Sequence, residues 1–158
     1  MKHTTWLYDN NPIVNIEGMP EGTYGFIYEV THIPTGKKYI GKKVLFFERN
    51  KKLGKRALEA LKEERKAKGI GGRTPLKQKI VSESDWKNYY GSQKEILELV
   101  KEGNQEEFKR EILQFVPNKK LLTYYENKLL FSLGVIEGDN GYINDNIEGR
   151  YFRKDFTN

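Results

Sequence analysis

The hydrophobic and polar pattern near the start of the chain predicts two neighbouring β-strands. Runs of β-branched and aromatic residues at 26–31 and 38–40 flank the turn formers Pro34-Thr35-Gly36, a pattern typical of a β-hairpin. Tyr28 and Tyr39 are equidistant from a turn centred between residues 33 and 34, so a symmetric register places them opposite each other on one face. A shift of one residue would place the two phenols on different faces.

Three later segments have the residue spacing of helices. Residues 119–133 form the clearest one, with Asn118 as the expected N-cap and Gly134 as its end. Residues 54–68 have only a narrow apolar stripe among Lys, Arg and Glu, which predicts a surface helix. The run Ser92-Gln93-Lys94-Glu95 has the pattern of a capping box and precedes a third, amphipathic helix.

The remaining pattern indicates an α+β fold. Residues 108–116 predict a strand that is apolar on both faces at its end, so we expect it in the middle of a sheet. Residues 79–81 suit a short strand, and residues 1–22, rich in turn formers, suit an irregular lead-in. We therefore expect a small central antiparallel sheet, made of the hairpin and the central strand and flanked by helices. It would belong to a single domain over residues 23–158, with a basic helical insertion at about 50–84.

Composition narrows the classes of function. With 37% hydrophobic and 32% charged residues, the chain has the composition of a soluble globular domain. The absence of cysteine excludes disulfides, thiolate catalysis and zinc-finger sites. Because no apolar run is long enough to span a bilayer, we expect no membrane partner and a cytoplasmic location.

The positive charge is concentrated in one part of the chain. The net charge is +6, but residues 42–79 contain 14 Lys and Arg against four Glu, so the remainder carries −4. Such a segment is typical of nucleic-acid binding, although a solvated helix face has the same composition. The side chains expected to contact phosphates are Lys42, Lys43, Lys51, Lys52, Lys55, Arg56, Lys62, Arg65 and Lys66.

One carboxylate interrupts the apolar stripe of the predicted helix at 119–133. Leu122, Glu126, Leu129 and Leu133 are spaced four, three and four residues apart and share one face. A carboxylate on such a face is costly unless it is paired, protonated or bound to a metal. The other interpretation is a flanking Glu whose carboxylate reaches solvent or a lysine.

The hairpin also carries two short motifs. Phe26-Ile27-Tyr28 and Tyr39-Ile40-Gly41 resemble the paired motifs of the GIY-YIG endonuclease superfamily, although Gly25 stands one place upstream of the usual glycine. The run from Gly36 to Lys43 and the run from Asp85 to Ser92 look most like phage-encoded endonucleases of that superfamily. The resemblance covers about residues 24–146.

This resemblance implies an endonuclease that hydrolyses DNA phosphodiester bonds with one Mg²⁺ or Mn²⁺ ion per site. A phage-encoded member would act in the host cytoplasm. The catalytic positions that it implies are Tyr28, Tyr39, Arg49, Tyr90, Glu126 and Asn144.

The implied roles differ between these residues. Glu126 would hold the metal, Tyr28 would be the general base and Tyr39 would position water or phosphate. Arg49 would stabilise the phosphate, while Asn144 would order its neighbours. A free phenol titrates near pH 10, so the pKa of Tyr28 would have to be lowered by a cation, or the phenol would have to work with metal-bound water.

Two alternatives stay open at this point. The long segment between Arg49 and Asp85 leaves Arg56, Arg65 and Arg73 as other candidates for the catalytic arginine. A basic nucleic-acid-binding module that keeps the fold but does not cut DNA would share the charge pattern.

Overall fold

The computed structural model describes residues 3–156, which divide into two compact units. The first contains the chain up to Leu45 and again from Asp85, and the second is Phe46–Ser84. Each unit is described by itself.

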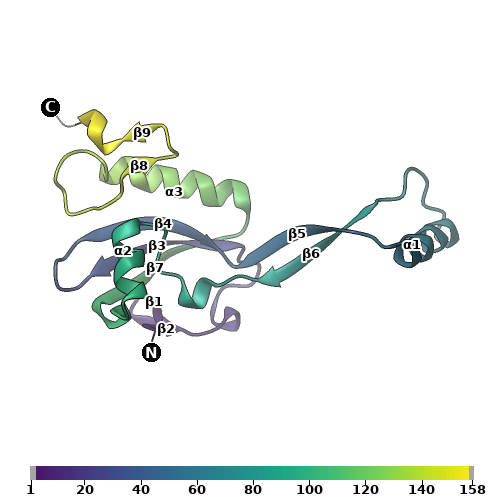
Figure 1. The fold of residues 1–158 in the computed structure, drawn as a ribbon, viewed down its shortest axis with the longest axis horizontal. Coiled ribbons are helices and arrows are strands. Elements are labelled where there is room, and N and C mark those ends of the chain that lie inside the picture. The colour runs from purple at the N-terminus through teal and green to yellow at the C-terminus, as the bar shows by residue number, and fades with distance from the viewer. Residues whose placement is uncertain (1–2, 157–158) are drawn as a thin grey trace. The chain divides into compact units, whose positions relative to one another are not determined.

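The first unit is built on a five-stranded sheet in the order β2-β1-β7-β3-β4, with β4 at one edge (Figure 1). β1 pairs with β7 in parallel, and the other neighbours are antiparallel. The expected α+β class and the central position of β7 are confirmed. The strands are β1 (Trp6–Tyr8), β2 (Asn11–Ile13), β3 (Gly25–His32), β4 (Lys38–Val44) and β7 (Phe108–Val116).

The start of the chain differs from the expected irregular lead-in, because it supplies β1 and β2 and a short 3₁₀ turn, η1 (Ile16–Gly18). Trp6 fixes this segment: its side chain is buried, and its indole donates a 2.7 Å hydrogen bond to the Trp86 carbonyl. Strands of three residues are too short for their periodicity to be read from the sequence.

The hairpin of β3 and β4 forms, but its register differs from the symmetric one. Tyr28 pairs with Gly41, and Tyr39 pairs with Val30. The turn is therefore centred between Pro34 and Thr35, one residue later than expected. Because this moves the pairing by two residues, Tyr28 and Tyr39 remain on the same face as diagonal neighbours.

The helix α3 (Lys119–Leu133) covers one face of the sheet, where Leu122 and Leu130 pack with Ile27 of β3 and Ile40 of β4. Figure 1 shows α3 lying along the sheet. The predicted boundaries of this helix are confirmed. The Asn118 side chain caps it by accepting a 2.9 Å hydrogen bond from the Leu121 amide, and Gly134 ends it in the left-handed conformation.

Aromatic side chains cover the other face. Trp6 and Trp86 make edge contacts with Phe26, and Tyr89 makes one with Tyr28. Three short helices belong to this part of the chain, namely η2 (Trp86–Asn88), α2 (Lys94–Lys101) and η3 (Gln105–Glu107). The cap of α2 is Gln93, which accepts from the amides of Glu95 and Ile96, so the capping box starting at Ser92 was a wrong prediction.

A β-bulge interrupts the pairing of β3 with β7 directly at Tyr28. Ile27 pairs with Gln114 and Tyr28 pairs with Ile112, so Leu113 is an extra residue in β7. The bulge inverts the alternation of side chains, which lets Val116 join the cluster beneath α3. This explains why the end of the strand appears apolar on both faces.

The chain closes with a small C-terminal element on the first unit. It consists of β8 (Asn146–Ile147), β9 (Tyr151–Phe152) and η4 (Arg153–Phe156). Ile147 is buried in the cluster with α3.

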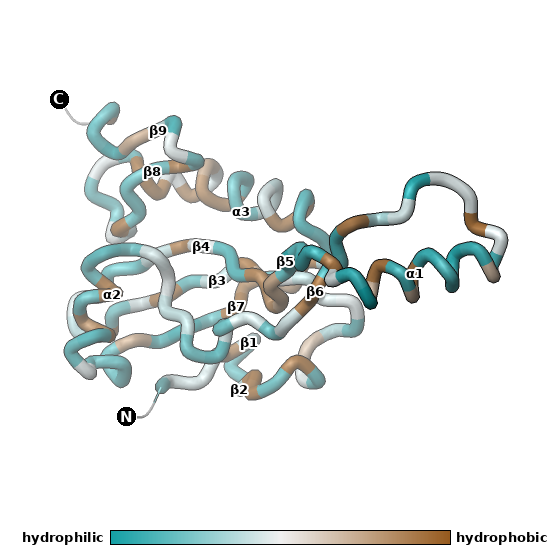
Figure 2. The backbone as a smooth tube through the Cα atoms, turned by 45° about the vertical axis from the view of Figure 1, so that its right-hand side comes forward, coloured by the Kyte–Doolittle hydropathy of each residue, from teal (hydrophilic) through white to brown (hydrophobic). Residues whose placement is uncertain are grey.

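The second unit is a β-ribbon with a helix. β5 (Phe46–Lys52) pairs antiparallel with β6 (Lys77–Glu83), and α1 (Lys55–Ala67) lies between them in sequence. The predicted surface helix and short strand are both present. In Figure 2, α1 is mostly hydrophilic with a few apolar positions. No helix in the described part of the chain is long and apolar enough to span a membrane.

Candidate active site

Three tyrosines and a serine form a cluster beside the edge strand β4. The rings of Tyr28 and Tyr39 have their centroids 6.3 Å apart, and the ring of Tyr89 lies 5.9 Å from that of Tyr28 in an edge arrangement. The Tyr39 hydroxyl is 3.0 Å from the Ser92 hydroxyl. Tyr28 is buried and Tyr39 is half-buried, so Tyr39 forms the accessible side of the cluster.

Two glycines make room for the Tyr28 hydroxyl. A Cβ at Gly41 would overlap that hydroxyl, and a Cβ at Gly91 would lie 3.3 Å from it and 3.2 Å from the Tyr39 ring. Gly91 also has a φ of 109°, which other residues rarely adopt. The glycine of the second motif is therefore required by the phenol of the first, which explains in physical terms why the two motifs occur together.

The cluster holds the phenols in their neutral form. Burial raises the pKa of Tyr28 well above 10, and the neighbouring Tyr89, Tyr39 and Glu126 raise it further. Burial also raises the pKa of Tyr39, although its hydrogen bond with Ser92 opposes the shift. The pKa shift of Tyr28 in the free protein is opposite to the lowered pKa expected with a neighbouring cation. The other expectation, that the phenol works with metal-bound water, stays a prediction.

Glu126 on α3 is half-buried, with 17% of its side chain exposed, and faces Lys42 of β4. The Lys42 ammonium lies 3.7 Å from one carboxylate oxygen of Glu126 and 3.0 Å from the Thr123 hydroxyl. Burial raises the pKa of Glu126, and the positive charge of Lys42 opposes this shift. Lys42, expected as a phosphate contact, is thus a neighbour of the candidate metal ligand.

The surroundings of Glu126 fit a hydrated divalent cation. Within residues 3–156 there is no group of three or more His, Asp and Glu side chains placed to hold a metal. A single carboxylate suits Mg²⁺, which keeps much of its water shell and binds one or two carboxylates together with substrate phosphate. The Glu126 carboxylate is partly open to solvent, and its neighbour in the free protein is the Lys42 ammonium at 3.7 Å.

Asn144 holds the edge strand rather than facing the phenols. Its side chain accepts a 3.1 Å hydrogen bond from the Ile40 amide and donates a 2.8 Å bond to the Ile40 carbonyl. The Asn144 carbonyl in turn accepts from the Arg153 guanidinium, which also reaches the carbonyls of Val135 and Tyr142. Asn144 therefore binds both backbone groups of Ile40, and its ordering role in catalysis stays a prediction.

Tyr90 does not join the cluster. It is buried on Arg110, whose guanidinium lies 4.1 Å from the Tyr90 ring centroid, and its hydroxyl accepts from the Thr4 amide. Its neighbour Tyr89 takes the place beside Tyr28. Tyr89 and Ser92, which were not among the expected site residues, therefore join the cluster, and a catalytic role for Tyr90 stays a prediction. Two adjacent tyrosines give no sequence signal that would separate them.

Two other expected site residues differ in exposure, because Lys43 is buried and Arg49 is exposed. Lys43 is buried, with its ammonium 2.6 Å from an Asp85 carboxylate oxygen and 4.0 Å from the Tyr89 ring centroid, so we no longer count it among the phosphate contacts. Arg49 is exposed in β5 of the second unit, where it pairs with Ile80. Arg110 and Arg153 in the first unit both donate to backbone carbonyls.

The other expected phosphate contacts, from Lys51 to Lys66, all belong to the second unit.

A family model described as "Putative endonuclease segE, GIY-YIG domain" matches residues 6–147. No curated protein and no solved structure matches the chain.

Proposed function

The chain belongs to the GIY-YIG endonuclease superfamily, and from that premise we propose that it hydrolyses DNA phosphodiester bonds with one divalent cation held by Glu126. The observation that supports this most is the position of Glu126, whose negative charge acts on all three phenols. The candidate metal ligand and the candidate proton acceptors therefore lie close enough to interact electrostatically, which supports the proposal. Hydrolysis requires water to be deprotonated and negative charge on the phosphoryl oxygens to be stabilised.

The protein's own groups have separate tasks in this proposal. Tyr28 takes the proton of the attacking water, and Tyr39, which is more exposed, positions water or phosphate through its hydroxyl. Gly41 and Gly91 keep the Tyr28 hydroxyl in place. Because the pKa of Tyr28 is raised, only a small phenolate fraction exists at neutral pH, but that fraction is a strong base.

Glu126 would hold the cation, which when bound would supply a Lewis acid to stabilise the leaving oxygen and would favour ionised neighbours. Mg²⁺ and Mn²⁺ both suit a carboxylate and water environment. Lys42 adds positive charge to the same place, so it can contact the substrate phosphate when the carboxylate is occupied by the cation. Arg49 is our candidate for a bidentate phosphate contact, because its planar fork matches a phosphate group.

The deciding experiment is cleavage of supercoiled plasmid DNA with Mg²⁺ and with a chelator. We expect Glu126→Gln to abolish cutting while DNA binding remains, because most affinity comes from phosphate contacts elsewhere. The matched control is Glu98→Gln, which removes an exposed carboxylate from α2 and should cut like the wild type. Cutting by Glu126→Gln at the wild-type rate would contradict the assignment.

Loss of folding can be separated from loss of chemistry in this experiment. The folded-state pKa of Glu126 is raised, so its ionisation costs stability once the pH exceeds the unfolded value. The Gln variant should therefore unfold at an equal or higher temperature than the wild type at pH 8, and this advantage should shrink toward pH 4. If wild type and variant both bind but neither cuts with either metal, a binding module without activity is the better description.

A further inference from the structure

The second unit carries more positive charge than the whole protein. Phe46–Ser84 contains 12 Lys and Arg against five Glu, a net charge of +7, whereas the complete chain has +6. The first unit, which contains the candidate active site, is therefore close to neutral at −1. Most of the charge that attracts a polyanion therefore belongs to the second unit, together with the candidate Arg49, whereas Tyr28, Tyr39 and Glu126 belong to the first.

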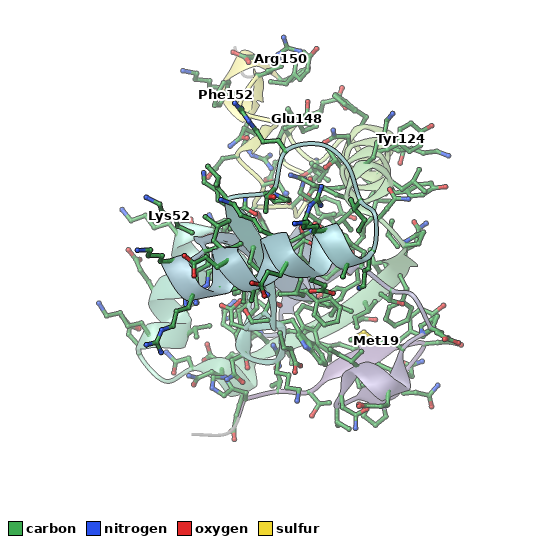
Figure 3. All side chains as sticks on the ribbon, turned by 90° about the vertical axis from the view of Figure 1, so that its right-hand side faces the viewer. Met19, Lys52, Tyr124, Glu148, Arg150 and Phe152 are labelled. Carbon is green, nitrogen blue, oxygen red and sulfur yellow. The ribbon has the colours of Figure 1, made fainter. Side chains whose placement is uncertain are left out.

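This unit has little to stabilise it internally. None of the apolar side chains of Phe46–Ser84 is buried, and α1 has no buried residue. The ribbon of β5 and β6 is exposed on both faces, and an isolated two-stranded ribbon is marginally stable in water. Figure 3, in which Lys52 is labelled, shows the side chains of α1 projecting outward. An element of this kind gains most of its order from a partner.

The ribbon also places like charges against each other. Lys52 pairs directly with Lys77, and two residues along β6 Lys79 extends the same face. Lys79 has a carboxylate partner in Glu48 at 3.1 Å, whereas neither Lys52 nor Lys77 forms an ion pair within the described residues. Like charges directly opposite in a sheet destabilise it, so this pairing costs stability in the free protein.

We propose that the second unit is a duplex-DNA-binding arm that becomes stably ordered on the phosphate backbone, with the cross-strand pair of Lys52 and Lys77 at the end of its ribbon next to α1. This inference rests on the proposed function for the identity of the polyanion. Five basic side chains lie in the half of the ribbon next to α1, namely Arg49, Lys51, Lys52, Lys77 and Lys79. Five more lie along the roughly 20 Å of α1, so the array is long enough to meet several phosphates. An acidic peptide or a single phosphate would neutralise only part of such a surface.

The pairing of Lys52 with Lys77 allows a test that distinguishes a DNA-binding arm from a surface that is only solvated. Lys77→Glu gives Lys52 an opposite charge across the ribbon, so it should stabilise the free arm while weakening its binding to DNA. Losing two phosphate contacts should lower the slope of log K against log salt by about 1.8, which corresponds to about a 30-fold weaker affinity at 0.15 M salt. Lys77→Gln, which removes one charge, should show about half the slope change.

Binding is measured by fluorescence anisotropy of a labelled duplex in the Glu126→Gln background, so that cutting does not interfere. Lys101→Glu, the same charge change at an exposed position of α2, is the matched control and should have a smaller effect. Hydrogen exchange followed by mass spectrometry should show that residues 46–84 exchange quickly in free protein and slowly with duplex. In the free Lys77→Glu variant, exchange in β5 and β6 should be slower than in the wild type.

The proposal of a DNA-binding arm would be contradicted if Lys77→Glu left the slope of log K against log salt unchanged. It would also be contradicted if the amides of residues 46–84 exchanged hydrogen at the same rate with and without duplex. Tighter binding to vesicles of anionic lipid than to duplex would do the same, because it would assign the surface to a membrane. Slope and exchange changes without plasmid cutting by the wild type would instead retain the arm and refute the proposed nuclease activity.

Discussion

The residues around Tyr28 determine both the position of its hydroxyl and its pKa. Its hydroxyl lies against the backbone of Gly41 and Gly91, with Tyr39 and Tyr89 on either side. Burial is the main cause that raises the pKa of Tyr28, and Tyr89 and Tyr39 raise it further, so the phenol holds its proton more tightly than a free tyrosine does. The cation expected at Glu126 would act in the other direction, because it cancels a carboxylate charge that raises the pKa of Tyr28.

The pH dependence of cleavage follows from this shift. If the Tyr28 phenolate is the base, the single-turnover rate should rise about tenfold per pH unit and should not level off below pH 9, since the pKa lies above that range in the free protein. Tyr28→Phe should lower the rate by about 10²–10⁴ and remove the rise, whereas Tyr39→Phe should keep it. A pH rise that persists in Tyr28→Phe and disappears in Tyr39→Phe would transfer the role of base to Tyr39.

At the scale of elements, the bulge in β7 positions the first motif. Leu113 is the extra residue opposite Tyr28, and bulges near active sites bend a strand and redirect a side chain. The ladder on both sides of the bulge keeps its partners, with Ile112 on Tyr28 and Gln114 on Ile27. The bulge therefore affects the direction of the Tyr28 side chain more than it affects the pairing of the strands.

Deleting Leu113 should leave a regular ladder between the same partners. We expect a folded protein that lacks the local twist at Tyr28, and a displacement of about 1 Å at a catalytic group can cost on the order of 10² in rate. Circular dichroism and thermal unfolding report the fold, and plasmid cutting reports the rate. Leu113→Ala keeps the bulge and is the control, so equal activity in deletion and control would show that the bulge has no catalytic effect.

The elements also show which sequence signals sufficed. The helix at 119–133 and the strand at 108–116 were predicted with their observed boundaries. The helix is a long periodic run between its N-cap Asn118 and Gly134, and the strand is a long apolar run that ends at Pro117. The hairpin register was wrong by two residues, since it depends on how the turn from His32 to Lys37 closes. Periodicity in the strands constrains the face of a side chain but not its partner.

At the scale of the whole molecule, the candidate catalytic arginine and the candidate metal ligand come from different units. Arg49 belongs to Phe46–Ser84, and Glu126 belongs to the unit with the central sheet. The sequence predicted a basic insertion from its charge and its helix. It could not predict that this segment lacks buried apolar residues, because that depends on how its few apolar side chains pack.

The arginine assignment is tested by single-turnover cleavage at saturating enzyme, where differences in binding do not contribute. We expect Arg49→Ala to lose about 10²–10³ in rate, the size of one electrostatic donor to a transition state. Arg49→Lys should recover only part of this, because an ammonium cannot make the bidentate contact. Arg56→Ala is the matched change in α1, and a large loss there with little at Arg49 would move the role to that helix.

The contact between Asn144 and Ile40 has a consequence for the order in which the protein is made. The two residues are 104 positions apart, so the ribosome synthesises β4 long before the amide that holds its edge. Arg153, which donates to the Asn144 carbonyl, follows later still. Until Asn144 has been synthesised, the strand that carries Tyr39 and Gly41 therefore lacks the side chain that binds both backbone groups of Ile40. The candidate site therefore cannot be complete before residue 144 has been made, however early its tyrosines are synthesised.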